Sequence, residues 1–220
     1  MSDSLRQIYK LRFSGHQNYR NAIWKTLVNK FFSKWIQIDS TLLDLGCGYG
    51  EFINNVEGCS KIAMDLNPDA RKYLNRDITF LEQDCSKPWQ LEPESIDLVF
   101  TSNFFEHLPN KQALSKTIYN VKSALKPGGR LLALGPNISA LNGCYWDFWD
   151  HHLPLSDQSL GELLEIHELT VEYSISRFLP YNMVRAGKKP LFLLNIYLRL
   201  PLLWNFFGRQ FLLVARKEIA

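Results

Sequence analysis

The stretch LLDLGCGYGEF, residues 42–52, constrains the fold of this chain more than any other part of the sequence. Its apolar start is typical of a buried strand with an acid, Asp44, near the end, and Gly46, Gly48 and Gly50 follow at G-x-G-x-G spacing. Glycines this close to a strand end indicate a backbone that turns tightly and lets a ligand approach where a Cβ would block it. In an open α/β sheet, such a turn lies in the crevice outside the carboxyl end of a strand, where ligands bind.

Two common nucleotide-binding turns do not fit this spacing. The nicotinamide-binding pattern is G-x-G-x-x-G, and Glu51 stands where its third glycine would be. A phosphate-binding P-loop needs a Gly-Lys-Ser/Thr sequence, which does not follow here. The glycines alone also suit an ordinary strand-to-helix turn, so the residues further along the chain decide whether a ligand binds.

The rest of the chain alternates short apolar strands with helices. Residues 17–37 carry one wide apolar face at helical period, which predicts a helix docked on the sheet. Further helices are expected after the glycine turn, from residues 67–69 onward, and over about 113–125. Strands are predicted over 41–45, 61–66, 78–81, 96–101, 130–135, 169–175 and 209–216. The alternation predicts a parallel sheet covered on both faces, whereas the last two strands, with no regular helix between them, are expected to pair antiparallel.

Acids recur at the ends of successive predicted strands, at Asp44, Asp65 and Asp84. Asp65 lies 21 residues after Asp44. That is close to the spacing of roughly 20 residues at which an acid in this kind of fold reaches a ribose diol. Asp65 alone also suits a helix cap, and Asp84 alone suits a turn. As a set after successive strands, the acids favour a ligand with ribose hydroxyls.

With these residues in place, the sequence resembles class I S-adenosylmethionine-dependent methyltransferases of the small-molecule type. The segments LLDLGCGYGEF, MDLNPDA, QDCS, IDLVFTSNFFEHL and LKPGGRLLALGPN occur in the order and spacing of that family, over roughly residues 40–137. The resemblance implies a three-layer, Rossmann-like α/β sandwich with a seven-stranded, mostly parallel sheet and one antiparallel strand near the C-terminus. It also implies a single methyltransferase domain over 1–220, with an N-terminal helical segment over 1–39, a cofactor-binding half over 40–137 and an acceptor-side half over 138–220.

The resemblance further implies S-adenosylmethionine as the cofactor and S-adenosylhomocysteine as the product. The residues it assigns to the cofactor follow the carboxyl ends of the first four strands. They are Asp44, Gly46, Cys47, Gly48 and Gly50 for the methionine part, Asp65 for the ribose, Asp84 and Cys85 for the adenine, and Asn103 for the floor near the sulfonium; Leu66, next to Asp65, is also assigned to the cofactor. The missing third glycine agrees with this assignment, because a dinucleotide would need it beside its pyrophosphate.

Methyl transfer to a hydroxyl would benefit from a general base, and histidines in two stretches suit that role. His107 follows the fourth strand, and His151 and His152 lie in CYWDFWDHHLPLS after the fifth. A structural role for His107 is the alternative. The residues around these histidines predict the wall of an acceptor pocket, or else a loop that completes the core: Phe104, His107, Tyr145, Trp146 and Trp149. Asp147 and Asp150 lie near the histidine pair, but without the spacing of known zinc sites, so no metal is predicted.

Composition limits the partners and the location. The net charge is +3, with +5 in residues 1–40 and −2 in the remaining 180, which indicates a solvated helix face rather than a nucleic-acid site. Polar residues and a proline interrupt the apolar stretch 191–213, so no transmembrane helix is predicted, and packing is favoured there over contact with a membrane surface. The four cysteines form no C-x-x-C pair and the N-terminus shows no signal-peptide pattern. We therefore expect a cytoplasmic protein that is a monomer or a homodimer.

The expected function is methyl transfer from S-adenosylmethionine to a small-molecule acceptor. The methyl group is expected to go to a hydroxyl oxygen of a sugar, a lipid-linked compound or another metabolite. The C-terminal third resembles, more loosely, methyltransferases of cell-surface sugar and lipid pathways, through FLPYNM, NIYLRLPLLWNFFG and QFLLVARK. The alternatives are a methyltransferase that acts on a macromolecule and a non-catalytic module that binds S-adenosylmethionine. A nicotinamide oxidoreductase disagrees with the glycine spacing.

Overall fold

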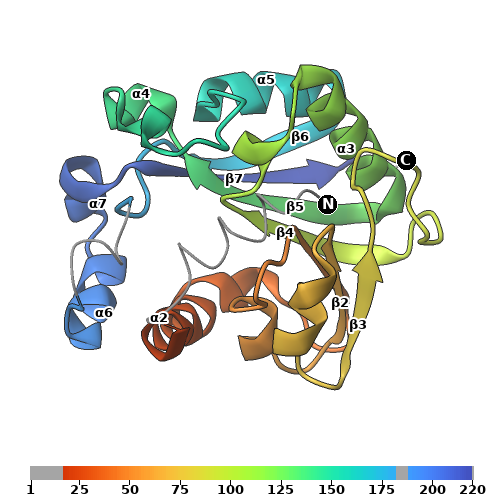
Figure 1. The fold of residues 1–220 in the computed structure, drawn as a ribbon, viewed down its shortest axis with the longest axis horizontal. Coiled ribbons are helices and arrows are strands. Elements are labelled where there is room, and N and C mark those ends of the chain that lie inside the picture. The colour runs from red at the N-terminus through yellow and green to blue at the C-terminus, as the bar shows by residue number, and fades with distance from the viewer. Residues whose placement is uncertain (1–16, 182–187, 220) are drawn as a thin grey trace.

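The computed structural model describes residues 17–181 and 188–219, arranged around one sheet (Figure 1). The sheet has seven strands in the order β3-β2-β1-β4-β5-β7-β6. The strands are β1 Thr41–Leu45, β2 Ser60–Asp65, β3 Ile78–Glu82, β4 Ile96–Ser102, β5 Leu125–Pro136, β6 Leu169–Ile175 and β7 Gln210–Lys217. The strands from β3 to β5 pair in parallel, and β7 runs antiparallel between β5 and β6. The predicted mostly parallel sheet with one antiparallel strand near the C-terminus is confirmed.

Helices cover both faces of the sheet, because successive residues of a strand point to opposite sides. Leu42 belongs to the cluster of buried residues on one face, and Leu43 belongs to the cluster on the other. The first face is packed by α2 Gln17–Lys30, α6 Leu191–Arg199 and α7 Pro201–Phe207, and the second by α3 Lys111–Ala124 and α5 Asp157–Ile166. The short helix α4 Ile138–Leu141 follows β5. The result is the three-layer sandwich that the sequence predicts.

Short turns of 3-10 helix connect several of these elements. They are η1 Phe32–Trp35, η2 Ile53–Asn55, η3 Pro68–Tyr73, η4 Phe105–His107 and η5 Cys144–Asp147. The prediction of a regular helix after the glycine turn is wrong, because only η2 lies between that turn and β2. The helix expected from residue 67 is η3, and it is capped as predicted: the Asn67 side chain accepts a hydrogen bond of 3.0 Å from the Asp69 backbone N–H.

The stretch between β6 and β7 contains α6 and α7, so the prediction of no regular helix there is also wrong. The polar residues and the proline that interrupt this apolar stretch do not prevent helices, and both helices begin next to a proline. Pro190 precedes α6, and Pro201 occupies the first turn of α7, where the missing proline N–H leaves no helical hydrogen bond unmade. The two helices bury Tyr197, Leu198 and Trp204. None of the helices that the structure describes is long and apolar enough to cross a membrane.

Candidate functional site

The backbone of the glycine turn after β1 adopts conformations that favour glycine. Gly46, Gly48 and Gly50 have φ angles of +71°, +54° and +70°. A Cβ at Gly46 would lie 2.3 Å from the Phe104 ring, and a Cβ at Gly50 would lie 2.5 Å from the Leu74 side chain. A Cβ at Gly48 would meet nothing within 4 Å. Gly46 and Gly50 are therefore needed for close packing, whereas Gly48 leaves open space beside the turn.

Asp65, at the carboxyl end of β2, is tied to this turn. Its Oδ2 accepts a hydrogen bond of 2.9 Å from the Gly48 N–H, and its Oδ1 accepts one of 2.8 Å from the Asn67 N–H. Burial raises the pKa of Asp65, although these hydrogen bonds favour the ionised form. Through these hydrogen bonds, the Asp65 carboxylate links the glycine turn after β1 to the turn after β2.

Two further acids lie beside Asp65. Asp44 is buried, and its pKa is held well above the usual range by burial and by the negative charges of Glu51 and Asp65. Glu51 is also buried, and its Oε1 lies 2.7 Å from Nη2 of Arg20 on α2. Burial raises the pKa of Glu51, and Arg20 offsets part of that effect. Three buried acids, Asp44, Glu51 and Asp65, therefore lie close together around the glycine turn.

After β3, Asp84 and Cys85 have different environments. The Asp84 Oδ1 accepts hydrogen bonds from the backbone N–H and the hydroxyl of Ser86, at 2.9 and 2.7 Å, so Asp84 closes a local turn. The Cys85 thiol is buried 3.3 Å from the Thr117 hydroxyl of α3, and burial raises its pKa to about 11. Leu66 is exposed after β2. The expected ribose and adenine contacts of these residues remain predictions.

The chain after β4 turns sharply at Asn103. This residue has a φ angle of +49°, which is uncommon outside glycine and often marks a functional site. Its backbone N–H donates to the Leu134 carbonyl at 2.8 Å, and its side-chain amide donates to the Ser102 hydroxyl at 3.0 Å. The next residue, Phe104, packs its ring on Gly46, so the segment after β4 contacts the glycine turn.

His107 lies at the end of η4, and its ring is oriented by Asp150. Its Nδ1 is 2.9 Å from the Asp150 carbonyl oxygen and 3.2 Å from the Asp150 Oδ2. Because both neighbours of Nδ1 are acceptors, the neutral ring carries its proton on Nδ1 and its lone pair on Nε2. The Nε2 atom is 3.9 Å from an oxygen of the buried Glu106.

His151 is brought to His107, whereas His152 is not. The His151 ring centroid is 5.0 Å from that of His107, and the ring is stacked on Phe148. Tyr145 is fully buried with its ring centroid 4.5 Å from that of His151, and burial raises its pKa. The His152 side chain is exposed, although its backbone N–H donates to the Glu106 carbonyl at 2.8 Å.

The other predicted acceptor-side aromatics point outward. Trp146 is 56% exposed and Trp149 is 90% exposed. Their assignment to the acceptor pocket remains a prediction, and contact with an acceptor would have to come from the exposed side of this loop.

Glu106, His107 and His151 also form a group that sequence spacing does not reveal. Each offers one ligand atom, and the three atoms lie within 4.8 Å of one another. Carboxylate and imidazole are ordinary ligands of divalent metals. The sequence suggested a metal only weakly, at His151 and His152, and none was predicted. The grouping joins the segment after β4 to the segment after β5, so only the tertiary structure brings it to light.

A family of methyltransferase domains matches residues 16–173 of the chain. The chain belongs to this methyltransferase family. Its members have the class I Rossmann-like fold and use S-adenosylmethionine, which is therefore the cofactor of this methyltransferase. The resemblance noted in the sequence is confirmed.

Solved structures share the fold of this methyltransferase. An S-adenosylmethionine-dependent methyltransferase from Archaeoglobus fulgidus has a TM-score of 0.70 at 19% identity, covering 96% of this chain and 99% of that one. A protein from Pyrococcus horikoshii has a TM-score of 0.69 at 18% identity, covering 99% and 100%. Among curated proteins, phosphoethanolamine N-methyltransferase 1 of Triticum aestivum is 31% identical over 101 residues, which are 41% of this chain. The matched part spans only 20% of that relative's length.

The glycine turn of this methyltransferase fits a cofactor that carries a sulfonium and an ammonium group. The three acids around the turn are close enough that Glu51 and Asp65 raise the pKa of Asp44, and such a concentration of negative charge favours a cation. The Asp65 carboxylate accepts hydrogen bonds from the backbone N–H groups of Gly48, Asn67 and Leu66, and an ionised carboxylate offers about four acceptor positions in all. Asp65 therefore retains acceptor capacity for ribose hydroxyls, and Gly48 leaves space beside it.

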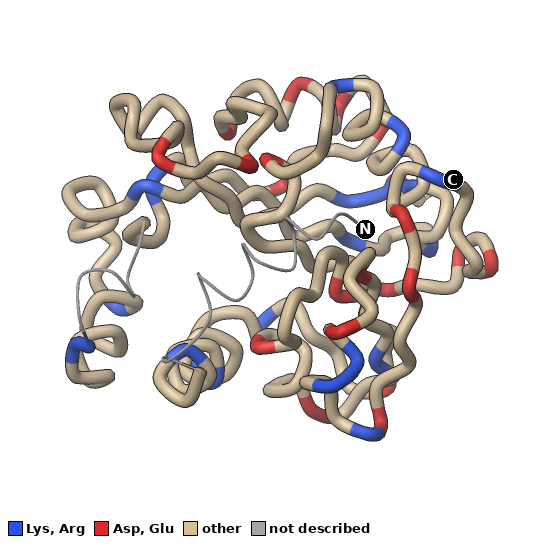
Figure 2. The backbone as a smooth tube through the Cα atoms, viewed as in Figure 1, with Lys and Arg blue, Asp and Glu red and all other residues tan. Residues whose placement is uncertain are grey.

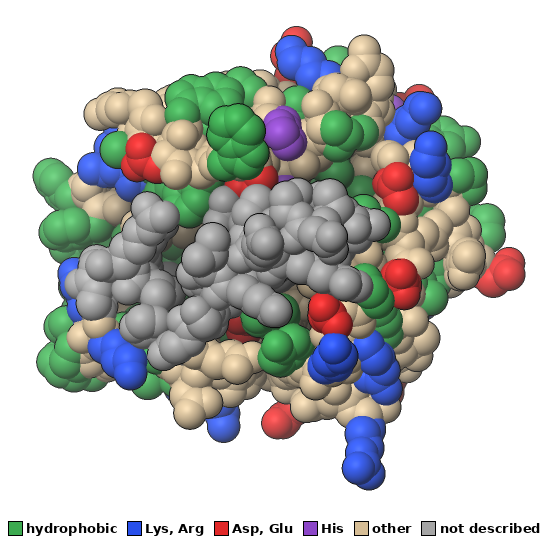
Figure 3. Space-filling model, viewed as in Figure 1, with side chains coloured by type: hydrophobic (Ala, Val, Ile, Leu, Met, Phe, Trp, Pro, Cys, Tyr) green, Lys and Arg blue, Asp and Glu red, His purple; other side chains and the backbone are tan. Residues whose placement is uncertain are grey.

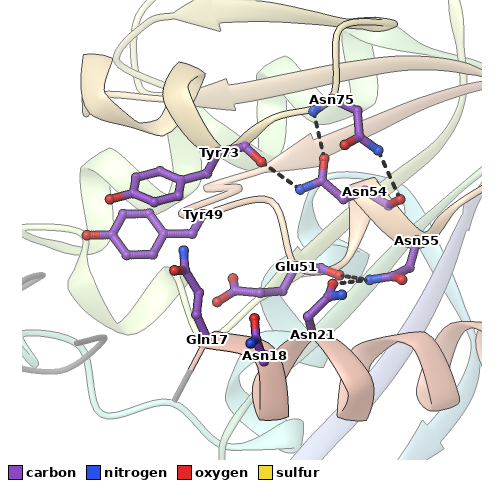
Figure 4. A pocket seen from close by; sticks show the side chains of 9 residues that line it. All are labelled: Gln17, Asn18, Asn21, Tyr49, Glu51, Asn54, Asn55, Tyr73 and Asn75. Carbon is purple, nitrogen blue, oxygen red and sulfur yellow. Dashed lines mark hydrogen bonds between the residues drawn. The ribbon is translucent and has the colours of Figure 1, made fainter. Parts of the chain in front are cut away.

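A polar pocket of about 370 Å³ lies beside the turn (Figure 4). Its walls come from the start of α2, the glycine turn, η2 and the end of η3. They carry six carboxamides, one acid and two tyrosines: Gln17, Asn18, Asn21, Tyr49, Glu51, Asn54, Asn55, Tyr73 and Asn75. The rings of Tyr49 and Tyr73 stack with centroids 4.0 Å apart, and burial raises the pKa of Tyr49 to about 12. The sequence did not predict this pocket, because its amides are scattered over separate segments.

Proposed function

We propose that this methyltransferase moves the methyl group of S-adenosylmethionine to a hydroxyl oxygen of a small acceptor, such as a sugar, a lipid-linked compound or another metabolite. The observation that carries the proposal is the pair of His107 and Asp150. Asp150 accepts a hydrogen bond from the Nδ1–H of His107, so the Nε2 lone pair is available as a general base. Phe104 links this histidine to the glycine turn, because its ring packs on Gly46.

On the cofactor side, the proposed roles follow the contacts of each residue. The turn from Asp44 to Gly50, including Cys47, would hold the methionine part, and Asp65 would accept hydrogen bonds from the ribose. Asp84 and Cys85 would border the adenine together with Leu66, and Asn103 would line the floor. The negative charge around the turn supports this assignment, since it favours the cationic form of the cofactor over its neutral thioether product.

The reaction requires two things of the protein: it must orient the acceptor, and it must accept one proton. When bound, S-adenosylmethionine supplies a methyl group on a sulfonium, which is a good leaving group. The protein orients the acceptor oxygen toward that methyl, and positioning of this kind can supply up to roughly 7–11 kcal/mol in favourable cases. His107 accepts the hydroxyl proton at Nε2 as the new bond forms, which contributes about 10²- to 10⁴-fold in typical cases.

The acceptor would lie between Phe104 and the loop that carries Tyr145 and Trp149. Tyr145 and His151 form the buried part of that wall, and the exposed Trp146 and Trp149 would cover the acceptor from outside. Aromatic faces near the sulfonium also favour its positive charge.

A small phosphorylated amine is a second candidate acceptor. The similarity to phosphoethanolamine N-methyltransferase 1 favours it, over the part of the chain that the two proteins share. An ammonium group must also lose a proton before it can attack a methyl group, so the same histidine would be needed.

The test is the release of S-adenosylhomocysteine with wild-type protein and a panel of acceptors: sugars, lipid-linked sugars, other hydroxyl metabolites and phosphoethanolamine. We expect turnover with at least one hydroxyl acceptor. His107→Gln should lower kcat by about 10²- to 10⁴-fold and remove the acid limb of the pH–rate profile. His152→Gln is the matched control, because this histidine is the exposed neighbour of the buried His151, and it should leave kcat within about threefold.

Three results would contradict the proposal in different ways. Turnover with phosphoethanolamine alone would favour the amine acceptor. Cofactor binding with no turnover on any acceptor would favour a non-catalytic binding module or a macromolecular acceptor. Loss of activity in EDTA with recovery on addition of Mg²⁺ or Mn²⁺ would assign Glu106, His107 and His151 to a metal instead of a base.

We also infer that residues 1–220 form one methyltransferase domain and that the protein is cytoplasmic. One sheet carries both the glycine turn and the segments with His107 and His151, which supports a single domain. All four cysteines, Cys47, Cys59, Cys85 and Cys144, are free thiols, as is usual in a reducing compartment.

A further inference from the structure

The helices α6 and α7 present an apolar surface to solvent. They bury Tyr197, Leu198 and Trp204 in the core next to α2, so packing accounts for part of their apolar content. Other large side chains of the same helices are exposed. We call these the α6–α7 patch: Phe192, Ile196, Leu200, Leu202, Phe206 and Phe207. Leu202 is 76% exposed and Phe206 is 72% exposed. Figure 3 shows hydrophobic side chains at the left of the molecule, where Figure 1 labels α6 and α7. Clustered exposure of this kind marks an interaction surface.

The chain around the patch carries positive charge only. Residues 176–209 contain six Lys and Arg and no Asp or Glu. In Figure 2 the tube over α6 and α7 accordingly shows no Asp or Glu. Lys188, Lys189 and Arg199 are exposed, and none of the three forms an ion pair with a carboxylate among the residues that the structure describes. Exposed cations that meet no described carboxylate, next to exposed apolar side chains, suit a partner that has both negative charge and an apolar layer.

We propose that the α6–α7 patch docks on the surface of a bilayer that contains anionic lipids. Helices with one apolar face and flanking Lys and Arg bind in the plane of the membrane interface, with the apolar side chains between the lipids and the cations at the headgroups. The helices have nine and seven residues, so they lie on the bilayer and do not cross it. The sequence alone favours packing over membrane contact for this segment, and the exposed side chains of the patch lead us to the other alternative.

A second copy of the chain is a less suitable occupant. In a two-fold dimer the same surface faces itself, so the cations of one copy would approach the cations of the other. Residues 176–209 contain no acid that would neutralise them. Like charges across an interface are strongly unfavourable, whereas anionic headgroups complement them.

The position of the patch connects it with the site. α7 ends at Phe207, and the first residue of β7, Gln210, pairs with Pro136 at the carboxyl end of β5. The patch thus lies near the carboxyl ends of the parallel strands. The glycine turn lies at the same end of the sheet. A docked protein would work close to the headgroups, where a lipid-linked acceptor is held. That consequence rests on the proposed function, whereas the docking does not.

The experiment is sedimentation of the full chain with vesicles of phosphatidylcholine alone or with about 30% phosphatidylglycerol. We expect binding to the mixed vesicles only, weakened as salt screens the cations. Phe206→Asp should lower binding at least about tenfold. Ile166→Asp, at a side chain of α5 that is 69% exposed, is the matched control and should bind as wild type. Lys189→Glu should also weaken binding, and Lys111→Glu, at an exposed position on α3, should not.

Binding of S-adenosylhomocysteine by each variant checks that it is folded. No sedimentation of folded wild type with anionic vesicles would overturn the proposal, and so would equal binding by Phe206→Asp and Ile166→Asp. A dimer in light scattering that Phe206→Asp dissociates, without vesicle binding, would assign the patch to contact between copies. Vesicle binding by a protein that transfers no methyl group would support the docking and contradict only the proposed function.

Discussion

The cofactor side of this methyltransferase and its proposed acceptor side are built differently. On the cofactor side, the hydrogen bonds that define the site join nearby residues: Asp65 to Asn67, two positions apart, and Asp84 to Ser86, also two apart. Gly48 and Asp65, 17 positions apart, are joined across adjacent strands. On the acceptor side, His107 and Asp150 are 43 positions apart and come from different loops. The first kind of site follows from turn chemistry at strand ends, and the second depends on how loops pack.

The two sides also differ in charge. The glycine turn collects three buried acids, and the acceptor side collects two histidines within a wall of aromatic rings. A negative site binds a cationic cofactor, whereas a histidine oriented by a carboxylate can accept a proton. If the proposed roles are correct, changes on one side should alter cofactor affinity and changes on the other should alter turnover.

The largest effect on cofactor affinity is expected for Asp65→Ala. The variant removes the acceptor of two backbone N–H groups and of the expected ribose hydroxyls, and charge-assisted bonds of this kind are stronger than neutral ones. Affinity for S-adenosylhomocysteine, measured by calorimetry, should fall at least about a hundredfold, equivalent to roughly 2.7 kcal/mol. Asp69→Ala is the control, because Asp69 is a partly exposed acid that pairs with Lys72. A loss below about threefold for Asp65→Ala would remove this residue from the cofactor site.

A smaller effect, on turnover alone, is expected for Asp150→Ala. The Asp150 carbonyl still accepts a hydrogen bond from the Nδ1–H of His107 in the variant, but the carboxylate at 3.2 Å is lost. Because Asp150 is a positioning residue, kcat should fall about tenfold to thirtyfold with KM and cofactor affinity unchanged. Asp147→Ala, at an exposed position of the same loop, should have no effect. Weaker binding of S-adenosylhomocysteine by Asp150→Ala would mean that the two sides are coupled and that the comparison fails.

The same difference explains what the sequence could predict. β1 and β6 have the predicted bounds, 41–45 and 169–175, because apolar runs and turn residues are local signals. The strand-end residues of the cofactor side were chosen from the same signals and a family resemblance. The grouping of His107 with His151 was not predictable, because it arises only after β4, β5 and their loops have packed. α6 and α7 were missed because a Leu- and Phe-rich segment with prolines has no clean period, and its helices are set by burial of residues such as Trp204.

Asp44→Asn should make the protein without cofactor more stable at neutral pH. The pKa of Asp44 is raised in the folded state by burial and by Glu51 and Asp65. Between the ordinary aspartate pKa and this raised value, the folded protein binds more protons than the unfolded one, so stability decreases as pH rises. Asparagine is neutral in both states, so it removes the free-energy cost of burying this carboxyl group. It can still accept the hydrogen bond from the Ile53 N–H. Tm at pH 7 should rise by about 2–4 °C, which corresponds to roughly 1 kcal/mol at this size.

A pH series separates this explanation from a general effect of the substitution. The gain in Tm for Asp44→Asn should shrink as pH is lowered toward the ordinary aspartate range, because wild-type Asp44 then becomes protonated as well. The variant should at the same time bind S-adenosylhomocysteine more weakly, which is the usual trade-off for a charged functional group. A variant that is less stable than wild type at neutral pH would show that the buried charge is fully compensated by contacts within the folded chain.

The smallest effect is expected for Trp149→Ala, and it probes the acceptor side at its outer edge. Trp149 is 90% exposed, so its removal takes little apolar area out of the core and should leave Tm unchanged. If this ring covers a bound acceptor, KM for the acceptor should rise by about threefold to fivefold with kcat retained, because only uniform binding is lost. Tyr119→Ala, an exposed aromatic on α3, is the matched control and should not alter KM. An unchanged KM for Trp149→Ala would restrict the acceptor wall to the buried ring of Tyr145 and to Phe104. The acceptor side would then, like the cofactor side, consist of residues that the fold has already fixed in place.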